Sequence, residues 1–582
     1  MFSTVLVANR GEIALRVMRA CRELGLRTVA IYSEADQDAL HIRYADQAVL
    51  IGPPAAAESY LNIEAIVEAA RRTRAGAVHP GYGFLAENPS FARACAAAGI
   101  VFIGPSAKAM ERMGGKVQAR REAAAAGVPV VPGTTDPVVD PATVRRLGDQ
   151  LGYPVAIKAS AGGGGRGLKV AMGPDDVAEA FAGARREAAA YFGSEELYVE
   201  RYLANPRHIE VQILADAHGT VLHLGERDCS VQRRHQKLIE EAPSPVLSDS
   251  ERAEIGAAAV RLARHVDYAG AGTLEFLWED GRFYFLEMNT RIQVEHTVTE
   301  EITGIDLVQW QIRVAQGERL PWSQEQISFR GHAIECRINA EDPADQFRPS
   351  LGMLTTYYEP HGLGVRVESG YRAGMAIPPQ YDSLVAKLIV WGQSRDEARA
   401  RMRRAVDDFE ITGIRTTLPF HRLALGHPVF AAGNATVRFI EEEVTEETLR
   451  ALGGPASSAP SPEPLEHARV FEVEVNGRRF AVRVAEAGAS AERARSPRRG
   501  ASSRRSDAAA TTDAVTAPMG GTVSAVRVTP GENVTAGQVL VVVEAMKMEN
   551  EIAAPHAGTI GEVRARPGMT VQVGDTLLTF AP

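Results

Sequence analysis

The sequence runs Gly272-Thr273-Leu274-Glu275-Phe276 and, shortly afterwards, Phe285-Leu286-Glu287-Met288-Asn289. Each run is typical of an apolar strand that carries one acid. Carboxylates on adjacent strands of a hairpin can face each other, and hard oxygen ligands at that spacing suit Mg²⁺ or Mn²⁺ bridging nucleotide phosphates. We therefore predict a metal site at Glu275, Glu287 and Asn289. The alternative is that both acids are solvated at a strand edge.

A glycine-rich run lies between two strand-like segments upstream of this pair. Val155-Ala156-Ile157-Lys158 leads into Ala161-Gly162-Gly163-Gly164-Gly165-Arg166-Gly167, and Leu168-Lys169-Val170 follows. Such a backbone can lay its N–H groups against phosphate oxygens, and Lys158 adds a positive charge. A flexible glycine hairpin is the alternative, because the run is neither a Walker loop nor a Rossmann fingerprint. Beside the two acids, we expect a small phosphate-binding lid.

The first residues alternate between strand and helix patterns. Val5–Ala8 and Thr28–Tyr32 are typical of strands, and the residues from about Gly11 to Leu24 are typical of the helix that joins them. Further strand-like runs alternate with alanine-rich helical stretches. We expect a doubly wound α/β domain over residues 1–113.

The last part of the chain contains an internal repeat with a constant offset of 37 residues, in which Gly521-Thr522-Val523 recurs as Gly558-Thr559-Ile560. Repeated short strands imply two similar half-sheets related by approximate two-fold symmetry. Glu544-Ala545-Met546-Lys547-Met548-Glu549 lies between the halves. We expect Lys547 at an exposed hairpin tip, where its amine suits amide formation, although most lysines are simply solvated surface residues.

Composition limits the class of protein. The chain has 582 residues, of which 45% are hydrophobic and 24% charged, and its net charge is −9. This length favours several domains, the charge argues against nucleic-acid binding, and no apolar run is long enough for a membrane helix. Four separated cysteines suggest neither a zinc site nor disulfides. The N-terminus shows no basic leader, so a cytoplasmic location is expected.

The run Ala545-Met546-Lys547-Met548, inside its repeat, resembles the biotinyl domain of biotin-dependent carboxylases. The resemblance implies that a biotin protein ligase attaches biotin covalently to Lys547. Lipoylation is the disfavoured alternative, because the related lipoyl domains normally carry an acidic residue before the lysine. We expect a small all-β domain, a flattened barrel, over residues 514–582. A linker at 447–513, with a hairpin at 470–484 and an arginine-rich tether, precedes it.

Residues 1 to about 446 resemble biotin carboxylase, an ATP-grasp enzyme. The matching runs are Ala8-Asn9-Arg10-Gly11-Glu12, His79-Pro80-Gly81-Tyr82-Gly83, Glu226-Arg227-Asp228-Cys229-Ser230, Gln232-Arg233-Arg234-His235-Gln236-Lys237 and Arg291-Ile292-Gln293-Val294-Glu295-His296. The resemblance implies an ATP-grasp domain of α+β class at 114–330, with a mobile lid at about 132–203, and a C-terminal carboxylase domain at 331–446. It also implies carboxylase homodimers.

The resemblance also assigns roles by motif position. The ATP-binding residues would be Lys116, Lys158, Gly162, Gly163, Gly164, Gly165, Glu200, Arg201, Leu203, His208, Gln232 and His235. The bicarbonate-binding residues would be Lys237, Arg291, Gln293 and the backbone of Val294. Glu295 would be the general base that removes the remaining proton of bicarbonate, and Arg337 would stabilise the enolate-like oxygen of biotin. Lys237 and Arg291 would complete the catalytic set; the alternative is a structural ion-pair network.

One position departs from the family pattern. The family often has proline after the Glu-His pair, where this chain has Thr297. We expect this difference to affect backbone rigidity alone and to leave the role of Glu295 unchanged.

Together the resemblances imply carboxylation of biotin on Lys547, driven by ATP and dependent on bicarbonate and Mg²⁺ or Mn²⁺. Nothing in the chain resembles a carboxyltransferase, so we expect a separate β subunit that takes the carboxyl group from carboxybiotin. The short connecting region favours acetyl-CoA or propionyl-CoA as the acceptor over methylcrotonyl-CoA or a longer acyl-CoA. Two other classes stay open: an ATP-grasp ligase with a lipoyl-type carrier, and a non-catalytic carrier.

Overall fold

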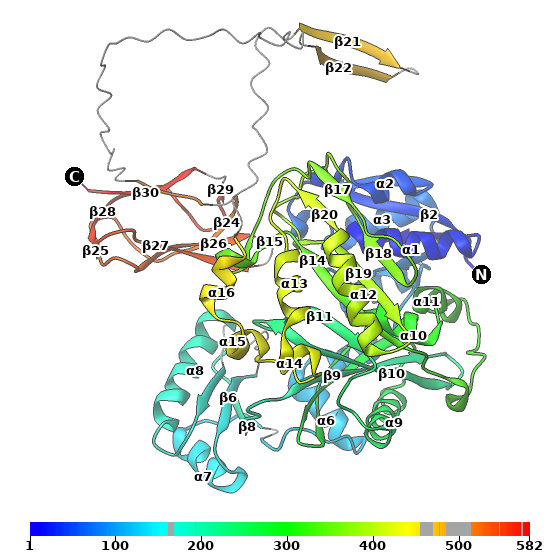
Figure 1. Ribbon diagram of the computed structural model, residues 1–582, viewed down its shortest axis with the longest axis horizontal. Helices are drawn as coiled ribbons and strands as arrows, with labels where there is room; N and C mark the ends of the chain where they lie inside the picture. Colours follow the sequence, from blue (N-terminus) through cyan, green and yellow to red (C-terminus); the bar gives the residue numbers. More distant parts are fainter. Residues whose placement is uncertain are drawn as a thin grey trace. The chain divides into compact units, whose positions relative to one another are not determined.

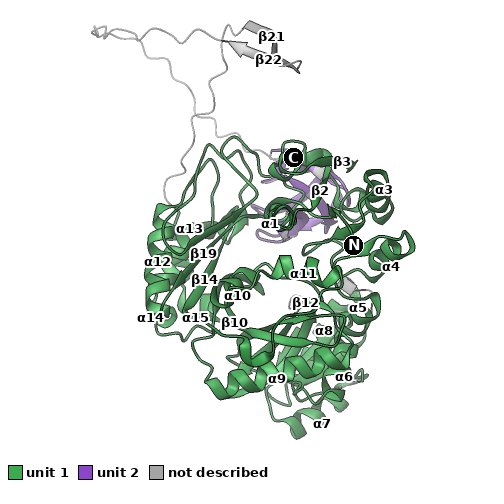
Figure 2. Cartoon of the chain, turned by 90° about the vertical axis from the view of Figure 1, so that its right-hand side faces the viewer, with its two compact units in different colours: residues 1–453, 545–547 green, residues 454–544, 548–582 purple. Residues whose placement is uncertain are grey.

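The computed structural model describes residues 1–134, 136–160, 168–192, 194–453, 469–475, 478–484, 514–518, 520–545, 548–571 and 574–581. The chain divides into two compact units (Figure 1, Figure 2). The larger unit spans Met1–Gly453, and the smaller one contains most described residues beyond Gly454. The predicted glycine run at 161–167 and the predicted biotin site at Lys547 lie outside the described residues.

The larger unit begins with a parallel sheet of five strands in the order β3-β2-β1-β4-β5. Its elements are β1 (Thr4–Val7), α1 (Gly11–Glu23), β2 (Arg27–Ser33), α2 (Leu40–Tyr44), β3 (Gln47–Gly52), α3 (Ile63–Thr73), β4 (Ala77–His79), α4 (Pro89–Ala97), β5 (Val101–Phe102) and α5 (Ala107–Gly114). Val5, Leu6 and Val7 are fully buried, as an interior strand of a parallel sheet requires. The strand order reverses at β1, which agrees with the predicted doubly wound α/β fold.

The largest sheet is antiparallel and has eight strands in the order β13-β12-β9-β10-β11-β14-β19-β18. The strands are β9 (Arg207–Ala215), β10 (Val221–Arg233), β11 (Gln236–Ala242), β12 (Gly270–Glu279), β13 (Arg282–Asn289), β14 (His332–Asn339), β18 (Val365–Ser369) and β19 (Leu384–Gly392). Glu275 on β12 lies directly opposite Glu287 on β13, as expected for acids on adjacent strands of a hairpin. Because β11 pairs with β14, the sheet crosses the predicted domain boundary at residue 330.

Helices cover this sheet in two groups. They are α6 (Lys116–Ala125) and α9 (Asp249–His265) in the first group, and α12 (Arg395–Asp408) and α13 (Leu418–Gly426) in the second. The first group shares a hydrophobic core with β9, β12 and β13, and the second packs on β14 and β19 (Figure 1). These two cores cover the sheet with buried apolar side chains on the strands that carry the site.

A smaller sheet of three strands, in the order β7-β6-β8, forms the predicted lid region. Its elements are α7 (Pro141–Leu151), β6 (Val155–Ala159), β7 (Leu168–Ala171), α8 (Val177–Phe192) and β8 (Leu197–Arg201). β6 and β7 are antiparallel neighbours, as expected for the strands on either side of the glycine run. Val155, Ile157 and Phe181 are buried in a core of their own.

Short elements complete the larger unit. They are α10 (His296–Thr303), α11 (Leu307–Ala315), β15 (Glu341–Asp342), β16 (Arg348–Pro349), β17 (Thr356–Tyr358), β20 (Glu410–Thr412), α14 (Pro428–Ala431), α15 (Phe439–Glu443) and α16 (Glu446–Ala451). α16 continues beyond the predicted domain end at residue 446. Thr445 caps this helix by accepting a hydrogen bond from Thr448, and Leu449 packs against the main core.

The C-terminal module consists of two four-stranded sheets, β23-β30-β28-β25 and β27-β26-β24-β29. The strands are β23 (Ala514–Thr516), β24 (Gly521–Val526), β25 (Asn533–Val534), β26 (Val539–Ala545), β27 (Met548–Ala553), β28 (Gly558–Val563), β29 (Thr570–Val571) and β30 (Thr576–Phe580). β24 and β28 occupy equivalent places in the two sheets, as do β25 and β29. Each sheet therefore takes strands from both repeats, which gives the predicted approximate two-fold symmetry.

The predicted hairpin in the linker is present. β21 (Arg469–Val475) and β22 (Arg478–Val484) pair antiparallel, with Val473 opposite Phe480. Among the residues that the structure describes, no helix has the length and apolarity to cross a membrane. The four cysteines are free and buried.

Candidate active site

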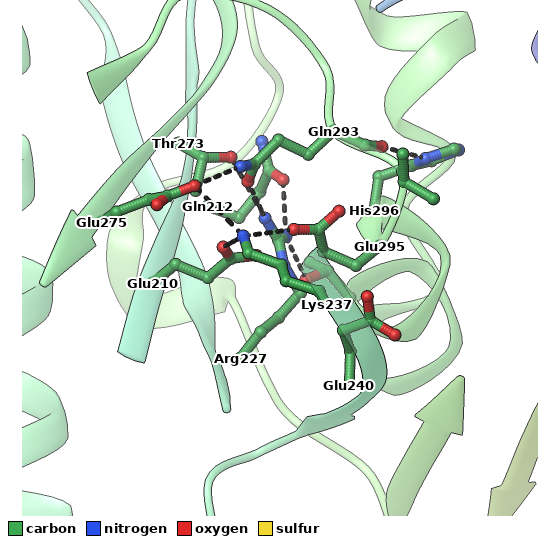
Figure 3. Close-up of polar contacts among 12 residues, drawn as sticks. Glu210, Gln212, Arg227, Lys237, Glu240, Thr273, Glu275, Gln293, Glu295 and His296 are labelled. Carbon is green, nitrogen blue, oxygen red and sulfur yellow. Dashed lines mark hydrogen bonds and ion pairs between the residues drawn. The ribbon is translucent and has the colours of Figure 1, made fainter. Parts of the chain in front are cut away.

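Charged side chains from distant parts of the large sheet meet at Glu295. Lys237 Nζ, on β11, donates to Glu295 Oε1 at 2.6 Å (Figure 3). Arg337 Nη2, on β14, donates to Glu295 Oε2 at 3.0 Å. Glu295 directly precedes α10 and is buried. The fold therefore brings the predicted base into contact with two predicted catalytic cations.

Glu295 is ionised in this arrangement. Burial favours its protonated form, but the charges of Lys237, Arg337 and Arg227 outweigh burial and hold the pKa of Glu295 well below its ordinary value. A general base must be ionised to accept a proton. Bicarbonate bound to the same cations would share their charge and would raise the pKa of Glu295.

Glu275 is the centre of a second set of contacts (Figure 3). Its Oε1 accepts hydrogen bonds from Asn289 Nδ2 at 2.8 Å, Gln293 Nε2 at 2.7 Å and Lys237 Nζ at 3.1 Å. Its Oε2 lies 2.9 Å from His208 Nε2. The residues predicted to hold the metal and the residues predicted to hold bicarbonate therefore share one cluster.

The residues of the predicted metal site fit a divalent cation. Glu287 faces Glu275 across the β12–β13 pair. Burial, and then the negative charge of Glu275, raise the pKa of Glu287. A cation between the two carboxylates relieves this repulsion, and Asn289 adds a third oxygen donor. This donor set suits Mg²⁺.

A different grouping of His208, Glu210 and Glu275 also brings ligand atoms within 4.8 Å of one another. Lys237 Nζ lies 2.5 Å from Glu210 Oε2, and Arg227 Nε lies 2.5 Å from Glu210 Oε1. Both oxygens of Glu210 therefore already face a positive charge. That arrangement opposes a metal ion at Glu210 and favours the pair of Glu275 and Glu287.

Arg227, on β10, connects the two sets of contacts and has no role predicted from the sequence. Its side chain is 0% exposed. It donates to Glu210, Gln212, Thr273, Gln293 and Thr299. Arg227 therefore holds the side-chain oxygen of Gln293, which is a predicted bicarbonate contact. Its place in the run Glu226–Ser230 was the one signal for it in the sequence.

Three hydrogen bonds fix the segment between β13 and α10. Arg291 donates to Glu87 Oε2 at 2.8 Å and to Asn289 Oδ1 at 2.7 Å. The carbonyl of Val294 accepts from Lys387 Nζ at 2.6 Å, and Lys387 is fully buried. No motif of the sequence pointed to Glu87 or Lys387.

The basic residues predicted near the ATP phosphates lie close to one another. Burial, and then the positive charges of His208, Lys116 and Lys158, lower the pKa of His235. The charges of Lys116 and His208 also act on Glu287. This concentration of positive charge beside the predicted metal site suits a polyphosphate.

Glu200, one of the residues predicted to bind ATP, pairs with two cations. Its Oε2 accepts from Arg120 Nη1 at 2.9 Å, and its Oε1 pairs with Lys158. The buried Glu200 therefore holds a predicted phosphate-binding lysine on the lid sheet. This pairing orients Lys158 from the strand that carries Glu200.

The other predicted nucleotide residues are spread over the neighbouring surfaces. Arg201 is exposed at the end of β8, and Leu203 is buried beside Val131 and Tyr284. Gln232 is buried on β10. Gly162, Gly163, Gly164 and Gly165 lie outside the described residues.

Thr297, where the family pattern often has proline, contacts another buried residue. Its hydroxyl donates to Glu335 Oε2 on β14. The expectation that Thr297 affects backbone rigidity alone is therefore wrong, because proline has no side-chain donor for this carboxylate.

Four family models match the chain. They are described as "Biotin carboxylase, N-terminal domain" at residues 1–110, "Carbamoyl-phosphate synthase L chain, ATP binding domain" at 115–323, "Biotin carboxylase C-terminal domain" at 335–442 and "Biotin-requiring enzyme" at 513–580. Together with the observed sheets, these matches confirm the predicted fold class: a doubly wound α/β part, an ATP-grasp part and an all-β biotinyl module.

Similar proteins cover most of the chain. A pyruvate carboxylase subunit from Methanothermobacter thermautotrophicus is 54% identical over 76% of this chain and 90% of its own length. The biotin-dependent acyl-coenzyme A carboxylase alpha3 subunit of Mycobacterium leprae is 46% identical over 94% of this chain and 93% of its own. The biotin carboxylase domain dimer of Hydrogenobacter thermophilus 2-oxoglutarate carboxylase, solved with MgADP, ADP and bicarbonate, has a TM-score of 0.73. It is 49% identical and covers 78% of this chain and 99% of that one.

Proposed function

The chain belongs to the biotin carboxylase family, and from this premise we propose that it uses ATP and bicarbonate to carboxylate biotin attached to its own Lys547. A biotin-requiring module on the same polypeptide makes it an α subunit of a biotin-dependent carboxylase. Lys547 is the only lysine in that module. The strands that flank it, β26 and β27, are neighbours in one sheet, which supports a hairpin between them.

The contact of Glu295 with Lys237 and Arg337 is the observation that carries the catalytic proposal. Glu295 accepts the proton of bicarbonate, while Lys237 and Arg291 hold the anion. Arg337 then stabilises the negative charge that develops on the ureido oxygen of biotin. The three groups reach one point from β11, β14 and the segment before α10.

The expected cofactors, biotin, ATP, Mg²⁺ and bicarbonate, agree with the comparisons. The matched models are ATP-binding and biotin-requiring, and the solved relative holds MgADP and bicarbonate. Mg²⁺ at Glu275, Glu287 and Asn289 would neutralise phosphate oxygens of the nucleotide. Biotin supplies the nitrogen that carries the carboxyl group.

We further propose that the carboxyl group passes to a separate carboxyltransferase β subunit, which transfers it to acetyl-CoA or propionyl-CoA. The similarity to the acyl-coenzyme A carboxylase subunit, which extends through the carrier module, supports this acceptor class. Another acyl-CoA is the alternative within that class. The sequence identity of 54% to a pyruvate carboxylase subunit supports a second candidate, in which the acceptor is a 2-oxo acid. A carboxylase homodimer, as in the solved relative, and a cytoplasmic location belong to the same proposal.

The assay for the first half measures bicarbonate-dependent ATP hydrolysis with free biotin. Glu295→Gln should reduce this activity strongly, because the amide accepts no proton at neutral pH. Glu301→Gln, on α10 just after Glu295 and partly exposed beside Arg366, is the matched control and should keep the activity. Unchanged activity in Glu295→Gln would rule out Glu295 as the base.

The assay for the second half detects biotin by streptavidin blotting of protein made with its ligase. The signal should disappear in Lys547→Ala. A signal that survives this substitution would place the biotin elsewhere.

The acceptor can be identified with radiolabelled bicarbonate and the natural partner subunit. Label should appear in acetyl-CoA or propionyl-CoA. Label in pyruvate or 2-oxoglutarate instead would favour the second candidate and would leave the carboxylase assignment intact.

A further inference from the structure

Two acids lie side by side behind Arg337. Glu240 on β11 and Glu335 on β14 are direct partners in the antiparallel register, so their side chains lie on the same face of the sheet. Both are 0% exposed. Glu240 lies on the strand that carries Lys237, below Glu295 in the view of Figure 3. Neither acid belongs to the predicted catalytic, metal or nucleotide set.

In each of the two carboxyl groups, one oxygen accepts a hydrogen bond and the other has no hydrogen-bond partner among the described residues. Glu240 Oε1 accepts from Arg337 Nε at 2.5 Å, and Glu335 Oε2 accepts from the Thr297 hydroxyl. Glu240 Oε2 and Glu335 Oε1 are buried and have no hydrogen-bond partner among the described residues. Two buried acceptors without a donor, on neighbouring strands, are costly unless a proton between them serves both.

The charges around the pair do not balance two carboxylates. Arg337 faces both acids, but it also donates to Glu295. Lys387, on β19, acts on Glu335 but already donates to a backbone carbonyl and lies 3.4 Å from Glu12.

The remaining neighbours do not supply the missing positive charge. Lys237 attracts Glu240, but it also contacts three other carboxylates. The negative charge of Glu295 repels that of Glu240. The thiol of Cys336 faces both acids and that of Cys229 faces Glu240, and burial keeps both thiols neutral by raising the pKa of each.

The balance of burial and charge favours protonation. Burial raises the pKa of Glu240 to about 7, although Arg337 opposes this shift. Burial likewise raises the pKa of Glu335 to about 8, against the charge of Lys387 and with the support of Glu240. Two buried acids on directly paired residues do not both ionise near neutral pH, which is the behaviour of a carboxyl dyad.

We propose that Glu240 and Glu335 hold one proton between them and that this proton positions Arg337 against Glu295. The inference rests on the proposed roles of Glu295 and Arg337. Arg337 divides its guanidinium between Glu240 and Glu295. Loss of the proton turns the pair into a dianion, which draws Arg337 away from Glu295 and from the ureido oxygen. Glu240 and Glu335 are thus positioning residues, and their ionisation gives the carboxylation rate an alkaline limit.

Infrared titration of the full-length biotinylated protein tests the proton directly. Glu335→Gln and Glu240→Gln should each remove the same protonated-acid carbonyl band at neutral pH, because one proton serves both residues. If the pair held two protons, each variant would keep a protonated-acid band from the remaining acid. If the pair held no proton, neither variant would lose a band. Either result overturns the proposal, and the two substitutions give independent answers if one of them prevents folding.

A matched control separates this pair from other buried acids. Burial also raises the pKa of Glu341 to about 7, but Glu341 accepts from Ser383 and Gln236 and has no contact with Arg337. Glu341→Gln should keep the band assigned to the pair. Loss of that band in Glu341→Gln would overturn the assignment.

The positioning role has its own readout in the pH profile of biotin carboxylation. The alkaline limb of kcat should move upward by about one pH unit or more in Glu335→Gln, since the amide cannot lose its proton. It should stay in place in Glu341→Gln. Thr297→Val removes a donor that stabilises the ionised form of Glu335, so the limb should also move upward.

An unmoved limb in both Glu335→Gln and Thr297→Val would overturn the positioning role. These measurements also separate the pair from the broader assignment. If the biotin carboxylase function were wrong, Glu295→Gln would keep its ATP hydrolysis, whereas the infrared band would still report the proton.

Discussion

The substitution Arg227→Met should lower the stability of the larger unit and weaken bicarbonate binding. Methionine retains an apolar chain that fills part of the buried space, but it removes every donor of Arg227. Glu210 keeps Lys237 as a partner, while Gln212 and Gln293 each lose a donor to their side-chain oxygen. Removal of one member of a buried ion pair costs about 3–5 kcal/mol, and each stranded acceptor costs about 1–3 kcal/mol. Since these contributions overlap, we expect a total loss of about 3–5 kcal/mol.

Urea unfolding of the full chain measures the loss, and steady-state kinetics measure the KM for bicarbonate. The KM should rise about tenfold, the equivalent of about 1.4 kcal/mol, because Gln293 loses its orientation. Arg207→Met is the matched control: Arg207 is also buried and donates to the Gly433 carbonyl at 2.7 Å, outside the site. It should reduce stability without changing the KM. A stability change below about 0.5 kcal/mol in Arg227→Met, or equal KM values in both variants, would refute the reasoning.

Three further outcomes follow from single contacts. Burial lowers the pKa of His41 to about 4, so the stability that neutral His41 contributes is complete above the ordinary pKa of 6.5 and is lost as the pH falls through 4. Thermal melts of His41→Gln should show a smaller loss of stability in acid, by about 3 kcal/mol at most. An equally steep loss in the variant would contradict this prediction. Gly133→Ala places a Cβ 2.4 Å from the Val199 carbonyl oxygen and 2.8 Å from Glu200 Cα, so it should lower the stability by about 1–3 kcal/mol and raise the KM for ATP. The control Gly127→Ala has open space around the new Cβ but a φ of +67°, so it should lower the stability and leave the KM unchanged. Lys387→Met removes the donor to the Val294 carbonyl and should lower kcat about tenfold with little change in the KM for ATP; an unchanged kcat would remove Lys387 from the positioning set.

The sequence predicted the features that depend on neighbours along the chain. Two strand-like runs that each carry an acid were sufficient to bring Glu275 and Glu287 together, because a hairpin pairs residues that lie close in sequence. The constant offset of 37 residues in the sequence repeat, which relates β24 to β28, likewise predicted the symmetry of the carrier module. Pairing between β11 and β14 was not predictable in this way. It joins segments about one hundred residues apart, and the contact of Arg337 with Glu240, like the pair of Glu240 and Glu335, depends on it.

The residues missed were those that serve other residues. Arg227 and Lys387 bind no substrate atom in the proposed function. The run of Lys387 looks like an ordinary sheet strand, and the run Glu226–Ser230 marked Arg227 without indicating its role. Thr297 was misjudged for the same reason: a single hydroxyl in a helix has no visible partner until β14 is placed beside it. Only the packed sheet shows which buried polar groups depend on one another.

The site contains no spare positive charge among its described catalytic cations, and this explains how a carboxylate with a lowered pKa can act as a base. Lys237 contacts three carboxylates, and Arg337 contacts two. In the proposed function, bicarbonate would bind by taking over donors that these carboxylates hold in the structure. Glu295 depends on Lys237 and Arg337 for its side-chain hydrogen bonds, so it loses the most when they turn to the substrate. Its pKa then rises, and its strength as a base is coupled to the arrival of the proton that it must remove.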